Sequence, residues 1–172
     1  IMALAMGTKK VRAVNKIVGA GSKWVALAKK KVFLEGLCGV ESANYGPSEI
    51  LVIGDSFTSP DIAASSMLAQ SEHSGDNLAV LLTKDKKLIG EVKLSIKNQL
   101  KDLPRNKIAR KSLNNYGVII RVTDDRKILS ICNHIGPEHI EILSKNFKKY
   151  LNKNLIAGSV CIGPYSSCLL YT

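Results

Sequence analysis

The chain has 172 residues, of which 45% are hydrophobic and 23% are charged. This composition is typical of a folded globular protein, and it excludes a disordered chain. The length suits one domain of ordinary size, or parts of two. Aromatic residues make up only 5% of the chain, so we expect a core built mainly from Ile, Leu, Val and Ala.

The formal net charge of +11 raises the question of a nucleic-acid partner. The excess is almost entirely Lys, spread from Lys9 to Lys153, and aromatic residues are not interleaved with it as stacking platforms. Arg, the side chain best suited to bidentate contacts with phosphate or guanine, is scarce. We therefore expect no nucleic-acid partner and interpret the charge as solvated Lys side chains.

The four cysteines form neither a CxxC pair nor a zinc-ribbon spacing; they are Cys38, Cys132, Cys161 and Cys168. Each has apolar neighbours, so we expect buried thiols in a reducing cytoplasm. No signal-peptide pattern is visible, and glycines and a proline interrupt the apolar stretch 155–172, so we expect no membrane association. Because Ile1 is not a natural initiator, we expect a fragment, a processed piece or a sequence without its first codon.

The beginning of the chain predicts a short strand at 16–18, a glycine-containing turn at 19–22 and a helix at 23–32. A turn of this kind is where open α/β sheets bind phosphates or cofactors, although the GxGxxG spacing is absent here. The Gly46-Pro47 turn is the best boundary. It divides the chain into part of a cofactor-side α/β domain at 1–45 and a second α/β domain at 46–172.

Beyond this turn, short apolar runs alternate with helical patterns. The predicted strands are 50–54, 78–83, 116–122 and 156–163, and the predicted helices are 61–70, 84–103, 108–113, 123–131 and 144–151. The run 140–143 is too short to decide between a strand and the start of a helix. The alternation predicts a layered, three-layer α/β domain (Rossmann-like) with a mostly parallel sheet.

Gln70 and His73 stand three residues apart at the end of the predicted helix 61–70. On a shared helix face they could reach one metal ion or one substrate. Imidazole is a good zinc ligand, whereas an amide oxygen is an unusual one. The alternative is that His73 only lies near a helix C-terminus, where positive charge is favourable. The spacing leaves both interpretations open.

Glu138 and His139 follow a Gly-Pro turn, and such a pair can serve as general base and water activator in one pocket. The alternative is two solvated side chains in a loop. Ser48, just before the strand 50–54, could hydrogen-bond a ligand or simply satisfy its own turn. The sequence contains no GxSxG nucleophile elbow, so it gives no support for serine hydrolysis.

Six segments, taken in order, resemble the histidinol dehydrogenase family: KIVGAGSKWVALAKKKVF, GPSEILVIGD, LAQSEH, LPR, IGPEHIEIL and AGSVCIGPYS. The family pattern has KIVGPGN, GPSEILVIAD, LLSQAEHD, IAPEHLE and AGAIFLGPYTPE with comparable gaps. The resemblance covers nearly the whole chain. It implies a homodimeric NAD- and zinc-dependent oxidoreductase that converts histidinol to histidine in two steps of histidine biosynthesis.

The resemblance also implies roles for individual residues. Gln70 and His73 match two zinc ligands, Ser48 matches a substrate contact, and Glu138 and His139 match the acid–base pair; all five belong to the implied substrate site. In the family, zinc holds histidinol through its imidazole and amine. A histidine removes the alcohol proton while hydride passes to NAD, and a glutamate helps to activate water for the second oxidation.

Two departures from the family pattern carry expectations of their own. Ser22 stands where the family has an asparagine that contacts the dinucleotide, so Ser22 is the candidate cofactor-binding residue. Thr172 falls about where an aspartate zinc ligand is expected, and a histidine ligand would follow it. We therefore expect two of four zinc ligands. The alternative functions are a non-catalytic truncated remnant and a basic interaction module.

Overall fold

The computed structural model describes residues 1–19, 21–41, 48–151 and 154–166. The chain divides into two compact units, Ile1–Gly46 (unit 1) and Pro47–Thr172 (unit 2), and each is described by itself. The Gly46-Pro47 turn that the sequence suggests as a boundary lies outside the described residues.

Unit 1 contains four elements: α1 (Met2–Met6), β1 (Lys16–Ile17), α2 (Lys23–Leu34) and β2 (Gly39–Val40). The two short strands are parallel, with Ile17 opposite Val40. Ala5, Ile17 and Val32 form a small core between the helices and strands. The predicted strand 16–18 and helix 23–32 are confirmed as β1 and α2, whereas α1 and β2 are too short for a sequence pattern to predict.

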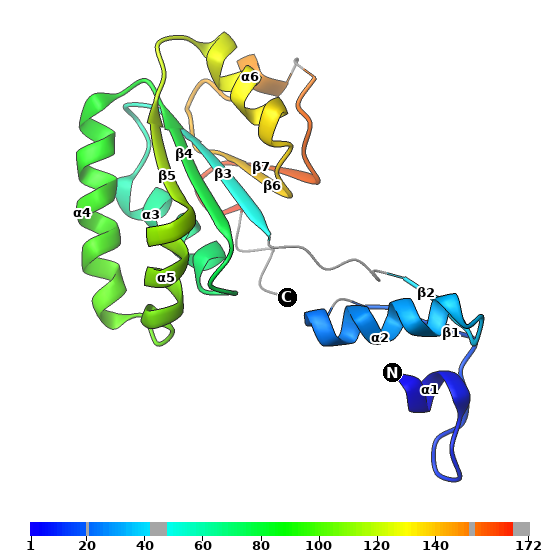
Figure 1. Cartoon of the computed structure of the whole chain (residues 1–172). Helices are drawn as coiled ribbons and strands as arrows, with labels where there is room; N and C mark the ends of the chain where they lie inside the picture. Colours follow the sequence, from blue (N-terminus) through cyan, green and yellow to red (C-terminus); the bar gives the residue numbers. More distant parts are fainter. Residues whose placement is uncertain (20, 42–47, 152–153, 167–172) are drawn as a thin grey trace. The chain divides into compact units, whose positions relative to one another are not determined.

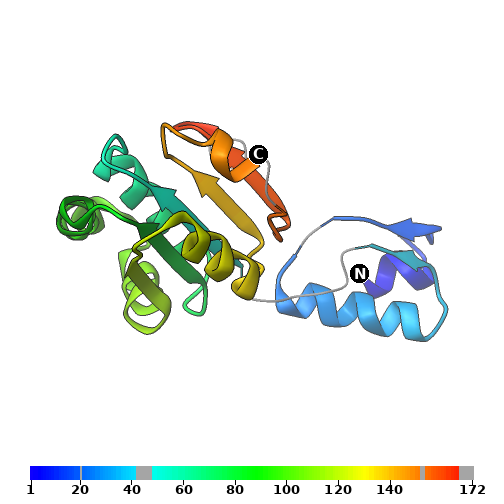
Figure 2. The same ribbon diagram turned by 90° about the horizontal axis from the view of Figure 1, so that it is seen from above.

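Unit 2 is built on a five-stranded, fully parallel sheet in the order β5-β4-β3-β6-β7. The strands are β3 (Glu49–Gly54), β4 (Leu78–Thr83), β5 (Gly117–Arg121), β6 (His139–Ile142) and β7 (Ser159–Ile162). β5 and β7 form the two borders of the sheet (Figure 2). The α/β fold class with a mostly parallel sheet is therefore confirmed, and residues 140–142 of the undecided run 140–143 belong to the strand β6.

Helices cover both faces of this sheet (Figure 1). One face carries α3 (Pro60–Ser71), α4 (Lys86–Asp102) and α5 (Asn106–Tyr116), and the other carries α6 (Asp125–Ile135) and α7 (Lys148–Leu151). Alternate residues of the central strands point to opposite faces and form two cores. Val52 and Leu81 pack with Met67 of α3, whereas Leu51 and Ile140 pack with Cys132 of α6. The result is the expected three-layer unit.

The predicted helix 144–151 is wrong over its first half, because only Lys148–Leu151 is helical. A carboxylate from another part of the chain holds the preceding residues as a loop. Asp55 accepts hydrogen bonds from the Ser144 hydroxyl (2.6 Å) and from the backbone N–H of Lys145 (3.0 Å). The Ser144 hydroxyl in turn accepts a bond from the N–H of Asn146. These bonds replace those that a helix would need.

In the described part of the chain, none of the helices is both long and apolar enough to cross a membrane. The cysteines described there are free thiols: Cys132 is buried as predicted, Cys38 and Cys161 are only partly buried, and Cys168 lies outside the described residues. Burial raises the pKa of the Cys132 thiol to about 12. This thiol therefore behaves as a small apolar core residue.

Candidate functional site

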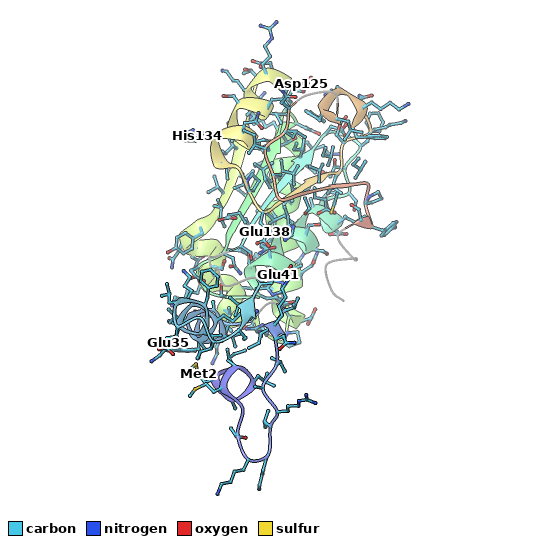
Figure 3. The ribbon with its side chains drawn as sticks, turned by 90° about the vertical axis from the view of Figure 1, so that its right-hand side faces the viewer. Met2, Glu35, Glu41, Asp125, His134 and Glu138 are labelled. Atoms are coloured by element: carbon cyan, nitrogen blue, oxygen red, sulfur yellow. The ribbon has the colours of Figure 1, made fainter. Side chains whose placement is uncertain are left out.

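The candidate residues of unit 2 gather at the edge where its parallel strands begin, which we call the amino edge. Ser48 directly precedes β3, and Glu138 precedes His139, the first residue of β6. The helix α3 lies between the parallel strands β3 and β4 in the chain, so its C-terminal end returns to this edge. In Figure 3, Asp125, which begins α6, lies near the top of unit 2, and Glu138 lies well below it.

At the amino edge, Glu49, Glu138, His139 and Ser159 form what we call the acid–base cluster. The Nδ1 atom of His139 lies 2.7 Å from the Ser159 hydroxyl oxygen, and its Nε2 atom lies 3.6 Å from Oε1 of Glu138. The His139 side chain is 17% exposed and that of Glu138 is 49% exposed. The imidazole is therefore mostly enclosed, with one nitrogen next to a hydroxyl and the other next to a half-exposed carboxylate.

The backbone around the acid–base cluster fixes these positions. Gly136 ends α6 with φ 56°, a left-handed conformation that glycine adopts without strain. The N–H of Ser159 donates to the carbonyl of Glu138 (2.8 Å), and Glu49 accepts a bond from the N–H of Glu138 (3.3 Å). A Cβ at Gly158 would lie only 2.8 Å from the Glu138 carbonyl oxygen, so glycine permits the close approach of the two strands.

Gln70 and His73 do not share a helix face, because α3 ends at Ser71 and His73 lies in the following turn. The N–H of His73 donates to the Gln70 carbonyl (3.3 Å), and Arg105 donates to the His73 carbonyl (3.3 Å). Gln70 is buried, whereas His73 is exposed. The two residues nevertheless lie close together, since both line the same pocket.

This pocket has a volume of about 430 Å³ and lies over the C-terminal half of α3. Its polar wall includes Gln70, Glu72 and His73, and its apolar wall includes Leu68, Leu103 and Tyr165. Glu138 and His139 are not among its lining residues. The structure therefore brings the predicted zinc ligands to one pocket, and places the predicted acid–base pair in a separate cluster at the same edge of the sheet.

Asn77, which the sequence gave no reason to single out, connects Ser48 with the end of α3. Its side chain is buried, and its Oδ1 atom accepts a bond from the N–H of Ser48 (3.2 Å). Its Nδ2 atom donates to the Gln70 carbonyl (2.7 Å). The N–H of Leu78 also donates to the Ser48 carbonyl (3.3 Å). Ser48 is therefore held from both sides by the start of β4.

The donor atoms of the pocket only partly fit a zinc ion. Gln70 offers an amide oxygen and His73 an imidazole nitrogen, whereas catalytic zinc normally has at least three protein ligands. In the residues that the structure describes, no group of three or more His, Cys, Asp or Glu side chains is arranged to hold a metal ion. Thr172, where the family pattern places a further ligand, lies outside the described residues.

In unit 1, Ser22 is exposed and forms the N-cap of α2. Gly19 before it has φ 115°, and a Cβ at Gly21 would lie 2.5 Å from Val25, so both positions require glycine. The ammonium group of Lys29, a buried residue, donates to the carbonyls of Gly19 and Glu41. This lysine ties the turn to the residue that follows β2, and it is a second residue that the sequence patterns did not indicate.

Comparison with known proteins gives consistent matches. The family model described as histidinol dehydrogenase matches residues 1–170. A histidinol dehydrogenase from Pelagibacter ubique is 47% identical over 168 residues, covering 96% of this chain, and one from Listeria monocytogenes is 42% identical over 167 residues, covering 97% of it. The crystal structure of histidinol dehydrogenase from Elizabethkingia anophelis superposes with a TM-score of 0.85 at 33% identity over 95% of this chain.

The chain spans only part of the length of these relatives. It covers 38% of the Pelagibacter ubique and Listeria monocytogenes proteins and 37% of the Elizabethkingia anophelis chain.

Proposed function

Because the chain belongs to the histidinol dehydrogenase family, we propose that it forms part of an oxidoreductase that converts histidinol to histidine with NAD and zinc. The observation that carries the proposal is the enclosed imidazole of His139, set between a hydroxyl and a carboxylate at the amino edge. At the same edge, the end of α3 and the turn after it bring Gln70 and His73 to one pocket.

In the proposed reaction, His139 is the general base. Its Nε2 atom takes the proton of the substrate alcohol, and an imidazole suits this task because its ordinary pKa lies near neutrality. The hydride leaves to NAD, which gives the aldehyde. Glu138, half-exposed beside Nε2, helps to activate the water that adds to the aldehyde, and transfer of a second hydride to another NAD gives the carboxylate. Ser48 is proposed to contact the substrate.

We propose that Gln70 and His73 supply two of the zinc ligands. When bound, the metal would orient the substrate as a Lewis acid. For NAD, we propose a contact at Ser22, because the N-terminal end of α2 presents backbone N–H groups to an anionic ligand. The shorter hydroxyl of serine makes fewer hydrogen bonds than the asparagine of the family pattern.

We also propose a cytoplasmic homodimer. Free thiols at Cys38, Cys132 and Cys161 suit a reducing compartment. Large apolar side chains of α2 remain exposed in the described structure, among them Trp24 (71%) and Phe33 (64%). Exposed aromatic side chains of this size are typical of surfaces that become covered on association.

Zinc binding tests the metal part of the proposal. We expect calorimetric titration with zinc to give a binding isotherm for the chain, and the isotherm to be lost in His73→Ala. His134→Ala is the matched control, because His134 is an exposed imidazole near the end of α6. The same zinc affinity in the chain and in His73→Ala would exclude His73 as a ligand.

Formation of NADH from histidinol, NAD and zinc tests the activity. We expect His139→Gln to abolish the NADH absorbance that the chain produces, while the melting temperature stays the same, because His139 lies at the start of a strand and is partly exposed. If the chain produces no NADH in the presence of zinc, the reading as a non-catalytic remnant is correct for this chain.

A further inference from the structure

Ser159 is the closest polar neighbour of the proposed base, and the sheet itself places it there. The first residues of β6 and β7 are partners in the parallel register, with His139 opposite Ser159. The N–H of Ser159 bonds to the Glu138 carbonyl, so the pairing of the strands fixes the serine relative to the imidazole. The hydroxyl oxygen lies 2.7 Å from Nδ1, which is hydrogen-bond distance.

The two nitrogens of the His139 ring have different surroundings. Nδ1 meets a neutral hydroxyl next to the backbone of β7, and Nε2 lies on the side of the Glu138 carboxylate at 3.6 Å. A neutral imidazole carries its single proton on one nitrogen, and the hydrogen bond at that nitrogen decides which one remains free to accept a proton. A hydroxyl can donate to Nδ1 or accept from Nδ1–H, so the role that Ser159 takes in this bond is linked to the nitrogen that can act as a base.

We propose that Ser159 is a positioning residue for His139: its hydroxyl oxygen accepts a hydrogen bond from Nδ1–H and leaves Nε2 as the proton acceptor beside Glu138. When Nε2 takes a proton, the imidazolium keeps its bond to Ser159, and the new N–H faces the Glu138 carboxylate. The serine can accept in both states, so the ring does not have to turn during proton transfer.

The inference adds to the roles that the family resemblance implies. Ser159 is not among the residues to which that resemblance assigns a role. Serine at this position gives the imidazole a partner that a methyl group would not supply. The catalytic consequence of the inference rests on the proposed function, since it requires His139 to be the base, but the hydrogen bond itself does not.

The tautomer of His139 tests the hydrogen bond without any activity measurement. The chain has three histidines, so isotope-labelled histidine gives a simple nitrogen spectrum in which His139→Gln identifies the signals of His139. We expect the Nδ1–H tautomer in the chain at a pH where the ring is neutral. In Ser159→Ala we expect a mixture of both tautomers, and in Ser159→Thr, which keeps a hydroxyl, the original tautomer. Ser130→Ala, at an exposed position of α6, is the control and should change nothing.

Two results of this measurement would overturn the inference: the Nε2–H tautomer in the unaltered chain, or the same tautomer population in the chain and in Ser159→Ala. Equal melting temperatures of the chain and of Ser159→Ala confirm that both are folded when compared. If the tautomer responds as expected but the chain forms no NADH, the positioning role stands and the proposed function fails.

Turnover provides the second readout where the chain is active. Loss of one orienting hydrogen bond should lower kcat roughly three- to tenfold and leave KM for histidinol unchanged, because Ser159 touches the base and not the substrate. Ser159→Thr should recover most of the loss. A rise in KM with unchanged kcat in Ser159→Ala would show that the serine contacts the substrate, and would contradict a positioning role.

Discussion

The side-chain nitrogen of Asn77 donates a hydrogen bond of 2.7 Å to the carbonyl oxygen of Gln70. In a longer helix this carbonyl would accept a bond from residue 74, so the bond to Asn77 helps to end α3 and to turn the chain toward β4. The same amide accepts from the N–H of Ser48. One buried side chain therefore sets the positions of a proposed zinc ligand and of a proposed substrate contact.

Replacement of Asn77 should destabilise the folded protein. We expect Asn77→Ala to lower the free energy of unfolding by about 2–3 kcal/mol, because it removes the buried amide that accepts from the Ser48 N–H and donates to the Gln70 carbonyl. Denaturant unfolding followed by circular dichroism measures the change. The control is Asn98→Ala on the exposed face of α4, where the amide contacts only Lys101 among the described hydrogen bonds; a change within about 0.5 kcal/mol is expected there. Equal effects of the two substitutions would show that the Asn77 bonds contribute little.

The carboxylate of Asp125 should make stability dependent on acid pH. It accepts bonds from the ammonium groups of Lys84 (2.9 Å) and Lys149 (3.0 Å) and from the hydroxyl of Tyr150 (3.1 Å). Partial burial raises the pKa of Asp125, but the bonds from Lys84 and Lys149 outweigh it, so the pKa is lowered. A lowered pKa gives stability that is complete above the unfolded value, about 3.9, and is lost as the pH falls through the folded value.

Asp125→Asn is the variant that tests this pH dependence. At neutral pH we expect it to be less stable by under about 1 kcal/mol, because a partly exposed ion pair is screened by solvent. Below about pH 4 the difference from the unaltered chain should shrink. Unfolding free energies of both proteins across this range measure it, and a difference that stays constant down to the acid limit would contradict the assignment.

Most of the larger domain could be predicted because its strands are continuous apolar runs. The segments 50–54 and 78–83 are buried on both faces of a parallel sheet, so they need no polar alternation and stand out from the helical patterns around them. The segment 144–147 was predicted wrongly because its conformation depends on Asp55, far away in the sequence. A local pattern carries no signal for such a partner.

The residues of the candidate site also divide into those that a local pattern indicates and those that depend on contacts between distant parts of the chain. Gln70, His73, Glu138 and His139 could be selected from the sequence because their residue types and spacings suggest chemistry. Ser159 and Asn77 could not, because an ordinary serine and asparagine gain their importance only from strand register and burial. The prediction that Gln70 and His73 share a helix face was wrong, since α3 ends at Ser71, between them in the sequence. A long-range bond to Asn77 contributes to that end.

The buried thiol of Cys132 should report global unfolding. Its pKa is raised to about 12 by burial between α6 and the sheet, so almost no thiolate, the reactive form, is present at neutral pH. We expect alkylation of Cys132, located by mass spectrometry, to be slow in the native protein and to accelerate with denaturant in step with circular dichroism. Rapid labelling without denaturant would show that α6 opens locally.

Gly158 offers the sharpest structural test of the acid–base cluster. A methyl group at this position would lie 2.8 Å from the backbone oxygen of Glu138, and a backbone atom cannot move aside as a flexible side chain can. We expect Gly158→Ala to push the start of β7 away from β6, to cost about 1–3 kcal/mol of stability, and to weaken the contact between Ser159 and His139.

The matched control for Gly158→Ala is Gly90→Ala. Gly90 lies inside α4, and a Cβ there would meet nothing within 4 Å. The substitution should therefore raise stability by about 0.5–1 kcal/mol, because alanine favours the helix and restricts the unfolded chain. The two alanines should shift the denaturation midpoint in opposite directions, and only Gly158→Ala should alter the tautomer of His139. If Gly158→Ala changes neither property, the two strands do not approach as closely as the bond between Ser159 and Glu138 requires.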